Sequence, residues 1–162
     1  MLTTAKFLME KLCRLIEFSL AFLLSAMTAV IFLQIFCRFV LNTGFAWSEE
    51  LARYLFVWMC MLAASVAVYR KENLGISFFV EALPPSGRKA CRLLVEVGCF
   101  VLFAHIVRYG YKILPIVGRQ TSASLEINMV IPYFAVIVSA TLMLVSTVIS
   151  FIEILGEKEG AA

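Results

Sequence analysis

The stretch INMVIPYFAVIVSATLMLVSTVISFI, residues 127–152, decides the fold, because it contains no charged side chain along its whole length. A second run, residues 18–37, is also free of charges. Both runs reach the length of about 20 mainly apolar residues that a helix needs to cross the roughly 30 Å of hydrocarbon in a bilayer. Hydrophobic residues make up 62% of the 162-residue chain, whereas a soluble domain is about 45–50% apolar. The sequence therefore predicts an integral membrane protein.

The apolar runs and the breaks between them predict an all-α membrane protein, with four transmembrane helices in one compact bundle and a single domain. We expect these spans at about residues 16–38, 48–70, 87–114 and 129–153. The second span begins at Ser48, a favourable N-cap, with Glu49 and Glu50 in the first turn, where the positive end of the helix dipole favours anions. The third is expected to stop at Pro115. The first apolar run is longer than a signal-peptide core, so we expect it to be retained.

Small side chains indicate where the helices pack. Cys60, Ala63 and Ala67 share one face of the second span, and three serines align on the fourth: Ser139, Ser146 and Ser150. Small residues let helix backbones approach closely in lipid. We expect these faces to pack within the chain's own bundle, although packing against a partner protein is an alternative.

The distribution of lysine and arginine predicts the orientation of the bundle. Nine of these residues fall in the two terminal segments and the second connection, and five fall on the opposite side. Because lysine and arginine accumulate on the cytoplasmic side of membrane proteins, both termini are expected in the cytoplasm.

The sequence contains none of the patterns that enzymes or cofactor proteins require. It has no Gly-rich phosphate loop, no nucleophile elbow and no cluster of residues with metal-ligand spacing. The five cysteines form no CxxC pair, and we expect them to be small buried apolar side chains. We therefore predict no enzyme, with no catalytic residue, cofactor or metal ion. A net charge of +3 is also too small to suggest a nucleic-acid partner.

Two ionisable residues in the third span leave alternatives open. Glu96 follows Arg92 by one helical turn, so the pair can reach the membrane interface together. Glu96 is alternatively the proton site of a self-sufficient small transporter built as a homo-oligomer. Another alternative is the membrane anchor of a respiratory enzyme, although the single histidine, His105, does not provide two axial haem ligands. Glu96 and His105 lie nine residues apart, on opposite helix faces, and so form no relay.

The stretch WSEELARYLFVW, residues 47–58, places three charges at the start of the second span. Glu49 and Arg53 have the i,i+4 spacing of a helical ion pair, and Arg38 at the end of the first span is expected to meet Glu50 across the turn. Trp47 is expected at the level of the lipid headgroups. One interpretation is a charge-neutral clip between the first two helices. The other is that part of the cluster faces a second membrane protein.

Residues 38–79 resemble the small membrane subunit of tripartite ATP-independent periplasmic (TRAP) transporters. That family has an arginine after the first span, then W-x-E-E-x-x-R, an aromatic-rich helix and a short basic loop. The matching residues here are Arg38, Trp47, Glu49, Glu50, Arg53, Trp58, Arg70 and Lys71. Where the family usually has a Gly, a His and an Asp, this chain has Ala63, Asn73 and Ser77.

The resemblance implies a bacterial inner-membrane protein with two protein partners, a large membrane subunit and a periplasmic substrate-binding protein. In such systems the large subunit carries the organic acid and the coupling sodium, while the small subunit braces its scaffold and shares in docking the binding protein. Under this interpretation the partner surface consists of Trp58 and the outer cluster, which comprises Arg38, Trp47, Glu49, Glu50 and Arg53. Lys112, Arg119 and Glu126 are weaker candidates for docking, since ordinary solvated loop charges explain them as well.

Overall fold

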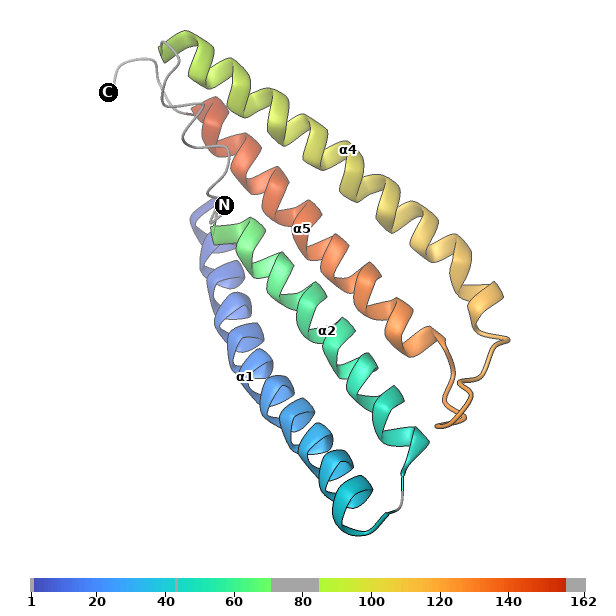
Figure 1. The fold of residues 1–162 in the computed structure, drawn as a ribbon. Coiled ribbons are helices and arrows are strands. Elements are labelled where there is room, and N and C mark those ends of the chain that lie inside the picture. The colour runs from blue at the N-terminus through green and yellow to red at the C-terminus, as the bar shows by residue number, and fades with distance from the viewer. Residues whose placement is uncertain (1, 43, 71–84, 157–162) are drawn as a thin grey trace.

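The computed structural model describes residues 2–42, 44–70 and 85–156, which form four long helices (Figure 1). They are α1 (Leu2–Val40), α2 (Ala46–Arg70), α4 (Pro85–Val117) and α5 (Val130–Gly156). Each contains a segment long and apolar enough to cross a membrane. The prediction of an all-α membrane protein with four spans is confirmed. Lys71, Asn73 and Ser77, named in the family comparison, lie outside the described residues.

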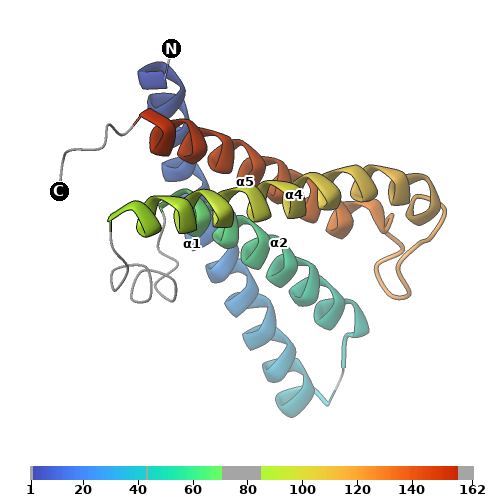
Figure 2. The same cartoon turned by 90° about the horizontal axis from the view of Figure 1, so that it is seen from above.

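The helices lie side by side in the order α1, α2, α5, α4 (Figure 1), and the extensive contacts join neighbours in this row. The last helix of the chain therefore sits between the second and the third. Seen from above, the α1–α2 pair runs at a steep angle to the α4–α5 pair (Figure 2). The described helices thus form one open layer, and the expectation of a compact bundle is wrong. No pattern in the sequence indicates this order.

The row has two distinct ends (Figure 1). The end that holds the α1–α2 turn (residues 41–42 and 44–45) and the α4–α5 loop (residues 118–129) is called the loop end here. The other end holds the starts of α1 and α4 and the last turns of α2 and α5, and is called the terminal end.

Helix α5 is the most buried part of the row, because it packs between α2 and α4. Its small side chains permit this close packing. The three serines predicted to align on this helix, Ser139, Ser146 and Ser150, are all buried, which confirms that they pack within the described chain. Cys13 and Ile16 of α1 and Val66 of α2 form a further buried cluster.

The contact between α4 and α5 depends on one glycine. A Cβ atom added at Gly110 would lie 2.7 Å from Cγ1 of Ile137, which is itself only 2% exposed. Real Cβ atoms are not found so close to another carbon, because optimal carbon contacts are about 3.5–4.0 Å. Glycine at this position therefore sets the distance between the two helices.

Three predicted helix ends are wrong. Helix α1 begins at Leu2, well before the expected start near residue 16. Helix α2 begins at Ala46, and Ser48 is not its cap: its buried hydroxyl donates a hydrogen bond of 2.7 Å to the carbonyl of Phe45. Helix α4 passes through Pro115 and ends at Val117. A proline removes its own amide donor and crowds the carbonyl four residues earlier, but the turn that follows still closes through the amide of Gly118 on the carbonyl of Leu114, at 2.8 Å.

All five cysteines are free thiols. Cys13 and Cys37 are buried, and the other three, Cys60, Cys91 and Cys99, are half-buried. This agrees with the prediction of apolar packing residues.

Candidate interaction site at the loop end

The residues predicted to form the outer cluster lie at the loop end, where α1 stops and α2 begins. Arg38 is in the last turn of α1, and Glu49 is in the first turn of α2. Trp47 is 38% exposed and its ring lies 6.0 Å from that of Phe45, centroid to centroid. Trp58 lies further along α2 and is half-buried. The site thus combines an exposed aromatic residue with charges of both signs.

The ion pair predicted between Glu49 and Arg53 is present. A guanidinium nitrogen of Arg53 lies 3.3 Å from a carboxylate oxygen of Glu49. Both side chains are about two-thirds exposed, at 67% and 68%. Exposed pairs of this kind contribute little to stability, roughly 0–1 kcal/mol. The pair is therefore available to a partner rather than essential to the fold.

Glu50 points to a different neighbour, the α4–α5 loop. One of its carboxylate oxygens accepts hydrogen bonds from the backbone amides of Ser124, at 2.9 Å, and Leu125, at 3.1 Å. The other accepts a bond of 2.7 Å from the hydroxyl of Tyr54, which is one turn further along α2. Hydrogen bonds to a carboxylate are stronger than those between neutral groups. This one side chain therefore ties the start of α2 to the loop before α5.

The predicted pair between Arg38 and Glu50 is wrong. Within the described residues no ion pair involves Arg38, and the carboxylate of Glu50 is occupied by the loop and by Tyr54. Arg38 is exposed in the last turn of α1, where a cation interacts favourably with the negative end of the helix dipole. The α1–α2 turn thus has no ionic clip of the kind the sequence suggested.

The loop that Glu50 holds has its own backbone bonds. Its two sides pair through the amide of Ser122 on the carbonyl of Ile127, at 2.9 Å, and the amide of Met129 on the carbonyl of Gln120, at 3.1 Å. The side chain of Asn128 bonds both to the carbonyl of Gly118 and to the amide of Val130, each at 2.9 Å. These bonds make residues 118–129 a short folded hairpin instead of a loose connection.

The three candidates for docking are placed differently from one another. Arg119 and Glu126 lie exposed on the loop, and Glu126 has a backbone φ of 54°, an unusual value for a residue with a side chain. Lys112, predicted to lie in the same connection, is instead part of α4. Its amine lies over the ring of Tyr109, 5.4 Å from the centroid. Of the three docking candidates, only Arg119 and Glu126 therefore lie on the α4–α5 loop.

The sequence did not reveal the loop partners of Glu50. Ser124 and Leu125 bind it through backbone amides, which almost every residue possesses, and they lie about 75 positions further along the chain. Ser122 is buried and its hydroxyl accepts a bond from the amide of Leu125, at 3.3 Å. The small, polar composition of the loop was the only available signal, and it indicates a turn without indicating what the turn binds.

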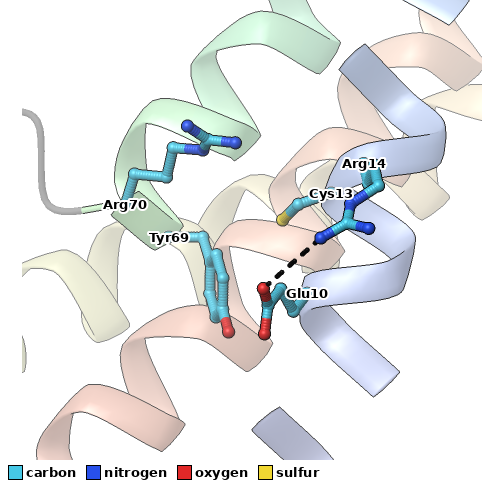
Figure 3. Close-up of a pocket in the computed structure, with 5 residues that line it drawn as sticks. All are labelled: Glu10, Cys13, Arg14, Tyr69 and Arg70. Carbon is cyan, nitrogen blue, oxygen red and sulfur yellow. Dashed lines mark ion pairs between the residues drawn. The ribbon is translucent and has the colours of Figure 1, made fainter. Parts of the chain in front are cut away.

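A crevice of about 490 Å³ opens at the terminal end, between α1 and α2 (Figure 3). It is lined by Glu10, Cys13, Arg14, Tyr69 and Arg70. Arg14 pairs with Glu10 at 3.8 Å, and Arg70 pairs with Glu17 of α1. The crevice thus carries charges of both signs and none of the predicted site residues. Among the residues that the structure describes, no group of histidine, cysteine and carboxylate side chains is arranged to hold a metal ion.

The exposure of the Glu49–Arg53 pair gives a first testable prediction. Arg53→Ala should lower the free energy of unfolding of the isolated chain by less than about 1 kcal/mol, because the pair is solvent-exposed. Thermal unfolding in detergent measures this, with Arg14→Ala in the exposed Glu10–Arg14 pair of α1 as the control. A collapse of the fold in Arg53→Ala alone would show that the pair is a structural clip.

The fold and the site together define a multi-pass membrane protein with a folded, charged hairpin at one end. Comparison with known proteins identifies the family to which this membrane protein belongs. Residues 27–157 match the family described as "Tripartite ATP-independent periplasmic transporters, DctQ component". The chain belongs to this family, and it is a multi-pass protein of the bacterial inner membrane. The resemblance seen in residues 38–79 is thereby confirmed.

Several curated relatives are similar to the chain. The sialic acid TRAP transporter small permease protein SiaQ of Vibrio cholerae is 38% identical over 90 residues, 56% of this chain and 52% of the relative. The C4-dicarboxylate TRAP transporter small permease protein DctQ of the same species is 31% identical over 94 residues, 58% of this chain and 40% of the relative. The isethionate TRAP transporter permease protein DctMQ of Oleidesulfovibrio alaskensis is 31% identical over 141 residues, 80% of this chain but only 22% of that longer protein. The matched part of the chain thus spans about half the length of SiaQ and a smaller share of DctQ and DctMQ.

Proposed function

We propose that the chain is the small, non-catalytic membrane subunit of a sodium-coupled TRAP-type secondary transporter for organic acids. In this role it braces the scaffold of a large transport subunit and helps to dock the periplasmic substrate-binding protein. The substrates are carboxylates such as dicarboxylates or sialic acid, in line with the names of similar small permease proteins. The sodium and substrate sites belong to the large subunit.

The observation that carries the proposal is the open row of helices. A single layer leaves large apolar side chains of an outer helix uncovered by the chain itself: 75% of Leu94 and 55% of Leu102 on α4 are exposed. Such a layer is suited to pack against a larger membrane protein and to support the part of that protein that does not move. The similarity to the much longer DctMQ protein supports this, since there the matching region is about a fifth of one polypeptide.

We further propose that the terminal end faces the cytoplasm, on the basis of the lysine and arginine count, and the loop end the periplasm. The loop end then presents Trp47, the Glu49–Arg53 pair and the loop charges Arg119 and Glu126 to a periplasmic protein. The bonds from Glu50 to the loop hold these groups in a fixed arrangement. A fixed surface binds a partner with a smaller loss of conformational entropy than a flexible one.

Reconstitution into liposomes tests the proposal. Uptake of an organic acid driven by a sodium gradient is expected only when the small chain, the large subunit and the binding protein are all present. Vesicles with the small chain alone should show none, and Glu96→Gln should leave uptake by the complete system intact. Accumulation by the small chain alone, abolished by Glu96→Gln, would instead establish the self-sufficient transporter. Failure of the two membrane subunits to co-purify in mild detergent would also contradict the proposal.

A further inference from the structure

Helix α4 has the shortest charge-free segment of the four described helices, residues 97–107. Glu96 and Arg108 lie only about 18 Å apart along the helix axis, at a rise of about 1.5 Å per residue. The hydrocarbon region is roughly 30 Å thick. At least one of these two charges must therefore lie below the headgroups. The charge-free runs in α1 and α5, residues 18–37 and 130–152, are long enough to avoid this. In α2, Arg53 and Arg70 lie about 26 Å apart along the axis, so the conflict is slight there and largest in α4.

The polar groups in the loop-end half of α4 lie on its uncovered side. His105, Arg108, Tyr109 and Lys112 are all exposed, and their spacing of three and four residues places them along one stripe of the helix. Gly110 and Phe103, which are on the opposite side of α4, are covered instead: Gly110 contacts Ile137 of α5, and Phe103 is 9% exposed. The polar stripe thus points away from the helix row.

The described part of the chain does not satisfy these groups. Nδ1 of His105 lies 2.8 Å from the carbonyl of Val101, but no described residue bonds to Nε2. Arg108 has neither a hydrogen bond nor an ion pair within the described residues. The amine of Lys112 lies over the Tyr109 ring, and the Tyr109 ring in turn contacts the His105 ring. Polar and charged groups at this depth normally face protein or a water-filled cavity, because lipid offers them no partners.

The opposite edge of the row has the properties of a lipid-facing surface. The most exposed large side chains of α1 are phenylalanines: Phe18, Phe22, Phe32 and Phe39 are each at least 69% exposed. The three hydroxyls between residues 7 and 40 of this helix are satisfied internally, since Ser19, Ser25 and Thr28 each donate to a carbonyl four residues earlier in α1. Lipid can cover this edge without leaving a polar group unpaired.

We propose that the polar stripe of α4, extended on the same side of the helix by Gly98, is the surface that meets the large membrane subunit, while the phenylalanine edge of α1 meets lipid. This inference rests on the proposed function and names the face through which it operates. The partner surface would supply hydrogen-bond acceptors, a carboxylate or free helix carbonyls, at the depth of His105 and Arg108. Gly98 adds a second argument: nothing lies within 4 Å of its Cβ position, so a helix of the partner can approach its backbone closely.

Site-specific photo-cross-linking in the intact complex tests the assignment. A photoreactive amino acid at Leu102 or at Tyr109 of α4, which are 55% and 58% exposed, should cross-link to the large subunit. The matched positions Phe22 and Phe32 of α1, 69% and 70% exposed, should not. Cross-links to the large subunit from α1 and none from α4 would overturn the inference. Cross-links from α4 only to lipid or to a second copy of this chain would overturn it too.

A substitution at Arg108 separates recognition from folding. Arg108→Gln should reduce recovery of the large subunit in co-purification about tenfold, because the partner is expected to bind the positive charge of Arg108. Arg108→Lys keeps this charge and should restore part of the recovery. The melting temperature of the isolated chain should be unchanged in both, since Arg108 has no partner in the described part of the chain. Undiminished recovery with Arg108→Gln would contradict the inference and leave the proposed function standing. If the unsubstituted subunits do not co-purify at all, the proposed function itself fails.

Discussion

Gly110→Ala is expected to lower the free energy of unfolding of the isolated chain by about 1–3 kcal/mol, the usual cost of inserting a methyl group into a packed interior. The new Cβ would lie 2.7 Å from Cγ1 of Ile137, a branched and buried side chain that has little room to move. Helices α4 and α5 must then separate. Denaturant titration in detergent micelles measures the loss.

Gly98→Ala is the matched control, because it lies in the same helix and nothing lies within 4 Å of the added atom. Alanine favours a helix over glycine by up to about 1 kcal/mol, so this variant should be as stable as the original chain or more so. The clash also predicts that the effects of substitutions at Gly110 and Ile137 on the free energy of unfolding are coupled. When Gly110→Ala is combined with Ile137→Ala, the total loss should be smaller than the sum of the two single losses. Equal stability of the two glycine variants would show that the close approach at Gly110 is not required.

Glu50→Gln is expected to loosen the α4–α5 loop. The neutral amide keeps the size of the side chain but loses the charge that strengthens its bonds to the amides of Ser124 and Leu125. Amide hydrogen exchange in residues 118–129 should become roughly tenfold faster or more, as expected when hydrogen bonds to a charged group are weakened. Mass spectrometry of peptides from this segment provides the measurement.

Glu49→Gln serves as the control for this change, since Glu49 bonds to Arg53 and not to the loop. Its effect on loop exchange should be negligible. Under the proposed function, Glu50→Gln should also weaken binding of the periplasmic protein while the complex with the large subunit stays intact. Unchanged exchange in Glu50→Gln would mean that the loop holds its shape through its own backbone bonds alone.

The sequence was sufficient for the spans and insufficient for their arrangement. Runs without charge around Phe22 and around Ser139 define a membrane helix by length alone, and the pair of Glu49 with Arg53 follows from helical spacing. The order of the row does not follow from either, because helices that are apolar on all sides offer no pattern to distinguish a covered face from a lipid-facing one. Only small residues such as Ser139 indicated where the packing would be.

The errors at the loop end have a common physical cause. The interpretation of Glu50 relied on charges, and Arg38 was the nearest cation on the neighbouring helix. The carboxylate instead binds amides from a loop 74 positions away, whose small, polar composition indicates a turn but not what the turn binds. The helix ends at Ser48 and Pro115 were missed because both residues are compatible with positions inside a terminal turn as well as at a boundary.

The placement of α5 between α2 and α4 affects how the protein is made. A ribosome delivers α1 and α2 first, and these two can pair as soon as both have left the translocation channel. Helix α4 follows, but the neighbour it packs against has not yet been synthesised. It must wait in the bilayer with its short charge-free segment until the 27-residue helix α5 is inserted and joins the two parts. The contact between α4 and α5 can therefore form only after α5 has been synthesised, and a chain stopped before Val130 would keep its first hairpin and leave α4 without the helix it packs against.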